Sequence, residues 1–247
     1  EPLHQEKVWE TRCESCRSMK NAKKIKVLFR HRSMEMGGVE KVLLSMLNNL
    51  DKNKFDIRLA LNLLQGELRN EIPKNIPVKI LAKGKEDMPK NALLNKLAMS
   101  FRGIKLLIYR NFPSIADNFI LKNDADVEIA TGYTMFSDVL NSSNKKSKKI
   151  GWFHSDITFP KLQPAVPLIL KQIPQFDYFI FGSQQTKDIL LETYPNIQLP
   201  ENKVILNAIP IEELKQKAAE FKPDFETKHP VFVTVGRLHS RKGHHKL

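Results

Sequence analysis

Glycines and a histidine stand at positions where an α/β protein could bind a phosphate or a sugar. Gly37 and Gly38 lie between an apolar run and a helical pattern, and their lack of side chains lets a ligand approach the backbone and a helix N-terminus. His154 follows the apolar run KIGWF, so its ring is expected at the end of a buried strand, where it could donate to a hydroxyl or phosphate oxygen. The structural alternatives are a turn for the glycines and a backbone-bonded loop residue for His154.

Two cations, Arg237 and Lys242, flank the loop GRLHSRKG after the apolar run VFVTVG. Positive side chains beside glycines at the start of a helix are the ingredients of a diphosphate clamp, and the alternative is a solvated basic turn. His239, His244 and His245 have no carboxylate or thiolate nearby in the sequence, so we expect no metal there.

Two further pairs of residues resemble metal ligands but lack the right surroundings. Asp124 and Asp126 form a DxD sequence that precedes a predicted strand, so their carboxylates are expected in a surface turn at the amino end of the sheet. Cys13 and Cys16 form a CESC step without the second ligand pair that a structural zinc site needs.

The hydrophobic pattern that positions these residues alternates between strands and helices. Short apolar or alternating runs predict strands at 25–29, 55–61, 78–80, 126–130, 149–153, 178–181, 204–206 and 231–236. Helical spacing predicts helices at 39–50, 91–110 and 211–221, and another that starts at Ser183. Because parallel neighbours need crossover helices, this alternation predicts an α/β, Rossmann-like, doubly wound parallel sheet.

The same pattern divides the chain into four parts. We expect a disordered leader over 1–23, a Rossmann-like domain over 24–210, a linker helix and connection over 211–229, and the start of a second Rossmann-like domain over 230–247. The strand expected at 231–236 has no element after it to pack against, which is why the second domain is expected to be truncated.

The charge balance restricts the partners. There are 40 Lys and Arg residues against 27 Asp and Glu, a formal net charge of +13, and such a field attracts nucleotide phosphates, nucleic acid or an anionic membrane surface. No apolar run approaches the roughly 18–20 residues that span a bilayer, and no signal peptide is visible, so the cytoplasm is the expected location.

The helix expected at 91–110 is basic and amphipathic. One side carries Leu93, Leu94, Leu97, Phe101, Ile104 and Ile108, and the basic residues Lys96, Arg102, Lys105 and Arg110 fall largely opposite. Such a helix is typical of binding to an anionic membrane surface. The alternative is an ordinary surface helix that covers the sheet.

These stretches, taken in order, resemble a known family: the retaining glycosyltransferases of the GT-B type, family four, which include lipopolysaccharide-core, capsule and phosphatidylinositol mannosyl transferases. The matching stretches are KVLFRHRSMEMGGVEKVLLSMLNNL, KIGWFHSD, FGSQQTKDIL, KVILNAIP and VFVTVGRLHSRKGHHKL, which run from about Lys24 to the end. Their order and spacing, more than any single motif, carry the resemblance.

The resemblance implies transfer of a hexose or N-acetylhexosamine from a nucleotide-sugar to a cell-surface glycan or lipid-linked acceptor. His154 would contact the transferred sugar, Gly37 and Gly38 would face the acceptor and donor phosphates, and Arg237 and Lys242 would neutralise the diphosphate of the leaving group. It also implies no metal or other cofactor and a peripheral position on the inner face of the cell membrane.

The chain also departs from the family's pattern, both beyond Leu247 and within the matched stretches. The family's glutamate-x7-glutamate motif would lie beyond Leu247, so the chain alone is expected to be inactive. Asn207 and Ala208 stand where the family usually has asparagine-glycine, and the basic loop RHRSMEMGG suggests an anionic acceptor.

Two other function classes compete with this one. A non-catalytic basic module that binds membrane or nucleic acid would explain the charge, although no nucleic-acid motif is present and nucleic acid is not the expected partner. A nicotinamide-dependent enzyme is disfavoured because the G-x-G-x-x-G fingerprint is missing after the first strand.

Overall fold

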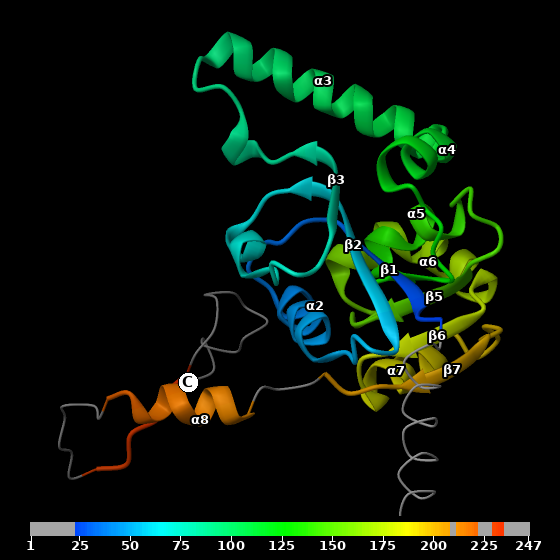
Figure 1. Ribbon diagram of the computed structural model, residues 1–247. Coiled ribbons are helices and arrows are strands. Elements are labelled where there is room, and N and C mark those ends of the chain that lie inside the picture. The colour runs from blue at the N-terminus through cyan, green and yellow to red at the C-terminus, as the bar shows by residue number, and fades with distance from the viewer. Residues whose placement is uncertain (1–22, 208–210, 222–228, 235–247) are drawn as a thin grey trace, which may run out of the picture. The chain divides into compact units, whose positions relative to one another are not determined.

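The computed structural model describes residues 23–207, 211–221 and 229–234. The chain divides into two units, residues 1–209 and residues 210–247. The first unit contains the sheet (Figure 1). In the second, the described residues include the helix α8 (Ile211–Ala219), as the helical pattern predicts.

A seven-stranded, fully parallel sheet organises the first unit. Its order is β3-β2-β1-β4-β5-β6-β7. The strands are β1 (Ile25–His31), β2 (Phe55–Leu64), β3 (Val78–Lys83), β4 (Val127–Ala130), β5 (Lys148–Phe153), β6 (Tyr178–Phe181) and β7 (Glu201–Val204). This order confirms the predicted doubly wound, Rossmann-like α/β fold, and its direction reverses between β1 and β4.

Helices connect the strands, as parallel pairing requires. They are α2 (Gly38–Asn49), α3 (Ala92–Asn111), α4 (Pro113–Ile115), α5 (Phe136–Leu140), α6 (Val166–Gln172) and α7 (Gln184–Thr193), with a π-helical turn at Ala116–Leu121 and short 3₁₀ turns at Glu67–Glu71, Lys85–Asp87, Tyr133–Met135, Pro160–Ala165 and Ile173–Gln175. The predicted start of α7 is confirmed, because the Ser183 hydroxyl accepts a hydrogen bond from the Thr186 backbone N–H at 3.1 Å.

Two strand predictions were wrong: one strand lies at another position, and the other segment is not a strand in its described part. The strand expected at 204–206 lies instead at β7, which ends at Val204 because its partner β6 ends at Phe181. The strand expected at 231–236 is irregular over 231–234, the only part of it that the structure describes. An extended segment forms a ladder only beside another strand, and none pairs with it among the described residues.

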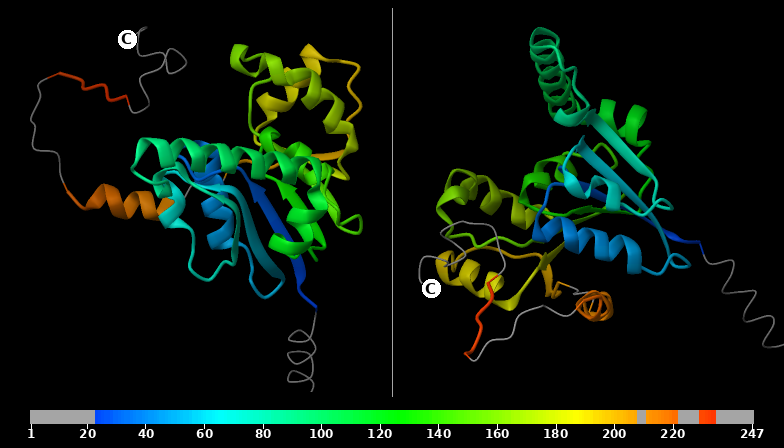
Figure 2. Two further views of the ribbon diagram at one scale, coloured as in Figure 1. Left: turned by 90° about the horizontal axis from the view of Figure 1, so that it is seen from above. Right: turned by 90° about the vertical axis from the view of Figure 1, so that its left-hand side faces the viewer.

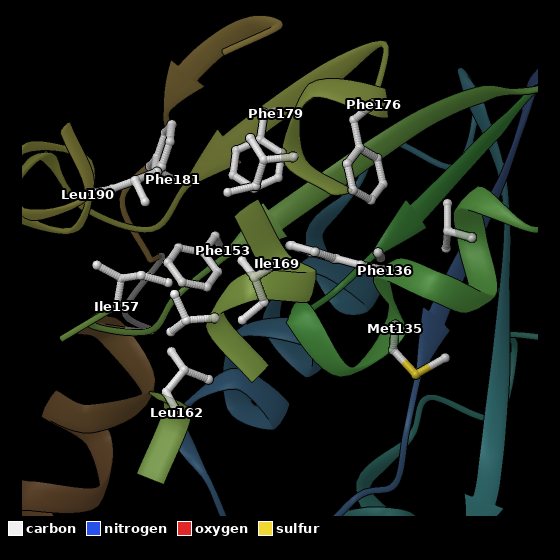
Figure 3. Packing of buried hydrophobic residues seen from close by; sticks show 14 residues of the cluster. Met135, Phe136, Phe153, Ile157, Leu162, Ile169, Phe176, Phe179, Phe181 and Leu190 are labelled. Atoms are coloured by element: carbon white, nitrogen blue, oxygen red, sulfur yellow. The ribbon is translucent and has the colours of Figure 1, made fainter. Parts of the chain in front are cut away.

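Aromatic packing forms the core around β5 and β6. The rings of Phe136, Phe153, Phe176 and Phe179 lie 5.0–6.5 Å apart in mostly tilted or edge-on contacts (Figure 3). Position 151 of β5 must be glycine, because a Cβ atom there would lie 2.5 Å from the Phe179 ring. The cluster thus holds α5 and the strands β5 and β6 together.

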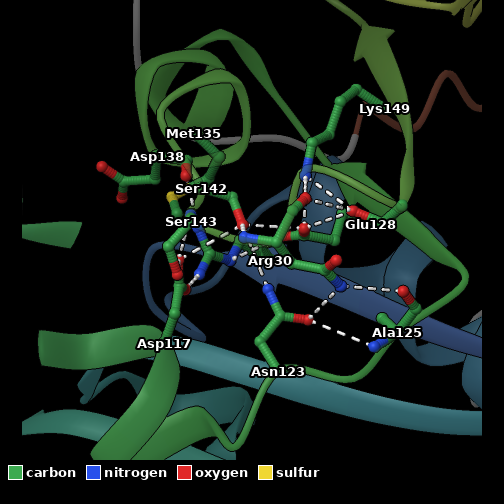
Figure 4. Close-up of polar contacts among 12 residues, drawn as sticks. Arg30, Asp117, Asn123, Ala125, Glu128, Met135, Asp138, Ser142, Ser143 and Lys149 are labelled. Carbon is green, nitrogen blue, oxygen red and sulfur yellow. Dashed lines mark hydrogen bonds and ion pairs between the residues drawn. The ribbon is translucent and has the colours of Figure 1, made fainter. Parts of the chain in front are cut away.

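A buried cluster of charges joins three neighbouring strands on the face that α5 covers (Figure 4). Arg30 of β1 forms ion pairs with Asp117 and with Glu128 of β4, the latter at 3.4 Å, and Lys149 of β5 pairs with the other oxygen of Glu128. The Ser142 hydroxyl lies within hydrogen-bond distance of both carboxylates, 3.2 Å from Asp117 and 2.8 Å from Glu128, and donates its one hydrogen to one of them at a time. Two cations therefore neutralise two carboxylates in a setting where an unpaired charge would be very costly.

Replacing Arg30 with methionine should destabilise the first unit by about 3–5 kcal/mol, because the substitution keeps the apolar stem but leaves the buried Asp117 carboxylate without its cation. Urea unfolding measures the change. The matched control is Lys41→Met, which removes an exposed ion pair with Glu71 and should cost less than about 1 kcal/mol. Equal effects of the two substitutions would contradict this account of the cluster.

Candidate functional site

Two side chains meet where the order of the sheet reverses. His31 ends β1, and Thr131 directly follows β4; both are buried. The Thr131 hydroxyl donates to the Arg30 carbonyl oxygen at 2.9 Å and lies 2.6 Å from Nδ1 of His31. Because that hydroxyl has one hydrogen, His31 Nδ1 must donate to it, which leaves Nε2 of His31 turned away from Thr131. In doubly wound sheets, ligands bind in the crevice at this reversal point.

A carboxylate from the first turn of α2 joins the pair. One oxygen of Glu40 lies 3.6 Å from Nε2 of His31. The other oxygen would lie 2.2 Å from a Cβ atom on Gly37, so glycine at this position makes room for the carboxylate. A Cβ atom on Gly38 would meet nothing within 4 Å, so this side of the first residue of α2 is uncovered, while the Glu40 carboxylate lies against Gly37.

His154 lies at the carboxyl end of the next strand, β5. Its ring packs on Trp152 with centroids 4.9 Å apart, and a Cβ atom on Gly182 would lie 2.8 Å from its Nδ1. Both ring nitrogens are buried without a hydrogen-bond partner in the part of the chain that the structure describes. Burial lowers the pKa of His154 to about 4, with a further lowering from His31 and an opposing effect of Glu40.

This arrangement suits a ligand rich in hydroxyl groups. At neutral pH His154 is an uncharged imidazole, which offers one hydrogen-bond donor and one acceptor. Leaving a buried polar atom unsatisfied costs roughly 1–3 kcal/mol, and a ligand that pairs with it recovers this free energy. The helix α2 begins beside this site, with the Glu40 carboxylate in its first turn.

The loop that carries Gly37 is held in place by the turn after β2. The Met34 N–H donates to the Gln65 carbonyl oxygen at 2.8 Å, and the Leu68 N–H donates to the Met34 carbonyl oxygen at 2.9 Å. Gly66 has φ +101°, and a Cβ atom there would lie 2.2 Å from the Met34 carbonyl oxygen. Only glycine fits, so the position of the loop depends on this residue.

The predicted basic helix is confirmed as α3. An ordinary surface helix turns its apolar side toward the sheet, whereas α3 turns its apolar side toward solvent. Figure 1 and the right-hand view of Figure 2 show it at the periphery of the first unit, and none of its residues is buried. Its apolar stripe points to solvent: Leu93, Leu94, Leu97, Phe101, Ile104 and Ile108 are all exposed. The side that touches the body of the unit carries the partly covered Leu106 and Tyr109.

The four basic residues of α3 have different positions. Lys96 and Lys105 are exposed, and the Lys105 ammonium lies 5.6 Å from the centre of the Tyr109 ring. Arg102 is partly covered and donates to the Lys83 carbonyl oxygen at 3.4 Å. Arg110 is exposed at the wall of a cavity below the helix. No described helix is both long enough and apolar enough to cross a membrane.

The DxD sequence lies where it was predicted, before β4 at the amino end of the sheet. Asp124 accepts hydrogen bonds from Lys26 and Arg58, and the bond from Lys26 is the main reason why the pKa of Asp124 falls to about 2. Asp126 accepts from the Lys26 backbone N–H at 2.8 Å. Both carboxylates therefore have structural roles.

Some predicted residues lie outside the described residues. These are the clamp cations Arg237 and Lys242, and the histidines and cysteines discussed as metal ligands, His239, His244, His245, Cys13 and Cys16. Within the described ranges, no group of three or more His, Cys, Asp or Glu side chains is placed to hold a metal ion.

Three residues of the site escaped the sequence analysis: His31, Glu40 and Thr131. The signal for His31 was its place at the end of the first strand, which matches that of His154 after the fifth. Glu40 stands in the first helical turn after the glycines. Thr131 follows β4 and becomes significant only once β4 is known to pair with β1.

Comparisons with known proteins give structural similarity only. No protein-family model matches the chain, and no curated protein matches it. HepE from Anabaena, in complex with UDP and glucose, is 17% identical, with a TM-score of 0.48 over 79% of this chain and 50% of its own.

Two further glycosyltransferases are similar to a comparable degree. The apo form of the lipopolysaccharide outer core galactosyltransferase WaaB is 14% identical, with a TM-score of 0.48 over 75% of this chain and 46% of its own. An alpha-glucosyltransferase in complex with UDP-glucose and DNA containing an abasic site is 14% identical, with a TM-score of 0.44 over 81% of this chain and 46% of its own. The chain thus spans about half the length of these structures, and its activity has to be inferred from its own residues.

The stability of the first unit should fall as the pH drops from about 6.5 to about 4. In this window the unfolded chain binds a proton at His154 and the folded chain does not, so protonation favours unfolding. His154→Gln should flatten this part of the profile of unfolding free energy against pH, measured by urea unfolding. Imidazole NMR of the wild-type chain tests the same point directly, and a His154 titration near pH 6.5 would contradict it.

Proposed function

We propose that the chain is the acceptor-side domain of a GT-B-type glycosyltransferase, followed by the start of its nucleotide-sugar domain. The whole enzyme would move a hexose or N-acetylhexosamine from a nucleotide-sugar to a cell-surface glycan or lipid-linked acceptor, with retention of configuration. No metal or other cofactor is required in this proposal. The ordered motifs discussed above motivate the family assignment.

One observation carries the proposal: an uncharged histidine with two unpaired ring nitrogens lies beside the reversal point of a doubly wound sheet. His154 would bind hydroxyl groups of the transferred sugar once its ring turns out of the buried position, with one nitrogen donating and the other accepting. The uncovered side of Gly38 would let a phosphate approach the first residue of α2 beside the Glu40 carboxylate. His31, held by Thr131 and close to Glu40, would face the same ligand.

Arg237 and Lys242 remain the proposed clamp for the donor diphosphate. As the glycosidic bond to the leaving group breaks, negative charge builds on the diphosphate, and two fixed cations would stabilise it. With a cationic pair in this role, the leaving group would need no metal ion.

The second part of the proposal concerns location: α3 would bind the chain to the anionic inner face of the cell membrane. Six large apolar residues of α3 point to solvent, where each is disfavoured, and Lys96 and Lys105 are exposed on the same helix. Moreover, the segment 88–116 contains no acidic residue, so nothing in it would repel anionic lipids.

In the full-length enzyme, His154→Ala should lower the rate of sugar transfer by about 100-fold, because it removes polar contacts to the transferred sugar. Arg237→Ala or Lys242→Ala should remove most of the activity. Transfer from a panel of nucleotide-sugars is the measurement. Asp124→Asn, which changes the DxD sequence at the other end of the sheet, should leave transfer intact. Wild-type rates for the His154 and Arg237 variants would refute the assigned roles.

The 247-residue chain should bind vesicles that contain phosphatidylglycerol more tightly than vesicles of pure phosphatidylcholine. Phe101→Ser should weaken this binding about tenfold, since the Phe101 side chain is 78% exposed and would enter the lipid. Vesicle co-sedimentation measures the affinity. Leu168→Ser, on the exposed surface of α6, is the matched control and should change nothing. If both serine variants bind like the wild type, α3 is not the membrane contact.

A further inference from the structure

A cavity of about 550 Å³ lies between α3 and the sheet, on the face opposite to His31. Its walls are largely apolar and come from β2, β3, α3 and the turn after α4; they include Ala60, Leu81, Leu106, Tyr109 and Leu121. The cavity exists because α3 touches the body of the unit only along one narrow side and buries no residue of its own. Well-packed domains leave few such spaces unless a ligand fills them.

Two arginine side chains without an ion-pair partner among the described residues line this cavity. Arg32 and Arg110 both line it, both are exposed, and neither forms an ion pair with a described residue. The third arginine of the lining, Arg30, is already neutralised by Asp117 and Glu128. Of the carboxylates in the lining, Asp117 is therefore paired, and Asp138 accepts a hydrogen bond from Asn62 at 2.6 Å. Three arginines against two aspartates give the lining an excess of one positive charge, and the guanidinium groups of Arg32 and Arg110 are its free donors.

The cavity is continuous with the apolar surface of α3. Leu107 lines the cavity and is still 48% exposed, so it connects the interior to the outer stripe of the helix. An apolar chain could therefore pass along α3 into the cavity while an anionic group stays at the two arginines. Neither a simple sugar nor a free phosphate would use both features.

We propose that this cavity binds the anionic head and first carbons of a membrane amphiphile, with a phosphate between Arg32 and Arg110. Guanidinium groups bind phosphate through paired N–H donors, and the leucines and Tyr109 surround the attached chain. Arg32 follows directly on His31 at the carboxyl end of β1, but the two side chains lie on opposite faces of the sheet. The role of this amphiphile as the sugar acceptor rests on the proposed function, whereas its binding does not.

Isothermal titration of the 247-residue chain with octyl phosphate, below its micelle concentration, tests the proposal. Octyl phosphate should bind at least tenfold more tightly than either inorganic phosphate or the neutral octyl glucoside, because only octyl phosphate has both recognised parts. Arg32→Gln and Arg110→Gln should each weaken octyl phosphate binding at least fivefold. Lys161→Gln and Lys171→Gln remove the same charge from exposed positions outside both the cavity and α3 and should leave the binding unchanged.

Two variants at Gly103 test whether binding needs the space of the cavity as well as its arginines. Gly103 lines the cavity, and a Cβ atom there would meet nothing within 4 Å, so Gly103→Phe would fill the space and keep both arginines. Replacing a glycine inside a helix also favours the helix, so the variant should fold. Gly103→Phe should abolish octyl phosphate binding, and Gly103→Ala should retain it.

Three results would overturn the proposal: equal affinity for inorganic phosphate, equal affinity for octyl glucoside, or binding that survives Gly103→Phe. The first would indicate a simple anion site, and the second an apolar site without charge selection. Since these titrations measure binding and not sugar transfer, an enzyme with no transferase activity would leave their outcome unchanged.

Discussion

The arrangement of this domain depends on one electrostatic constraint: the charges buried between β1, β4 and β5 must neutralise one another. Arg30, Asp117, Glu128 and Lys149 are nearly inaccessible to water, so each would be strongly destabilising without its partners. Satisfying all four at once requires these three strands to lie side by side in one register. The cluster therefore selects the register at the point where the sheet reverses direction, in addition to any stability it contributes.

That register also sets the geometry of the candidate site, because successive residues of a strand point to opposite faces. Arg30 and Glu128 point to the face covered by α5, whereas His31 and Thr131, which follow Arg30 and Ala130 in paired positions, point to the face of α2. A slip of one residue would exchange the two sets and leave charges facing the apolar side. The pairing of β1 with β4 that places Arg30 beside Glu128 therefore also holds His31 in contact with Thr131. Both contacts are fixed by the backbone of the two strands.

Local sequence patterns were sufficient for most elements but not for contacts between them. The apolar runs and helical spacing predicted the strands before β7 and the position of His154, since both depend on the period of a single segment. The pairing of His31 with Thr131, and of Arg30 with Glu128, joins residues about 100 positions apart and follows only from the strand order. The edge strand β7 was misplaced because its end is set by its neighbour β6. For α3, the pattern gave the apolar stripe, but the side facing the sheet depends on tertiary contacts of Leu106 and Tyr109.

The exposed stripe of α3 is difficult to explain by stability alone. A helix kept for folding would turn its leucines and Phe101 toward the sheet, where burial of each large apolar side chain contributes roughly 1.5–3 kcal/mol. Instead, α3 buries no residue, exposes its apolar side and leaves a cavity with two unpaired arginines beneath it. An apolar partner on the outer side and an anionic group in the cavity would compensate for both features, and a phosphorylated amphiphile at a membrane surface provides both.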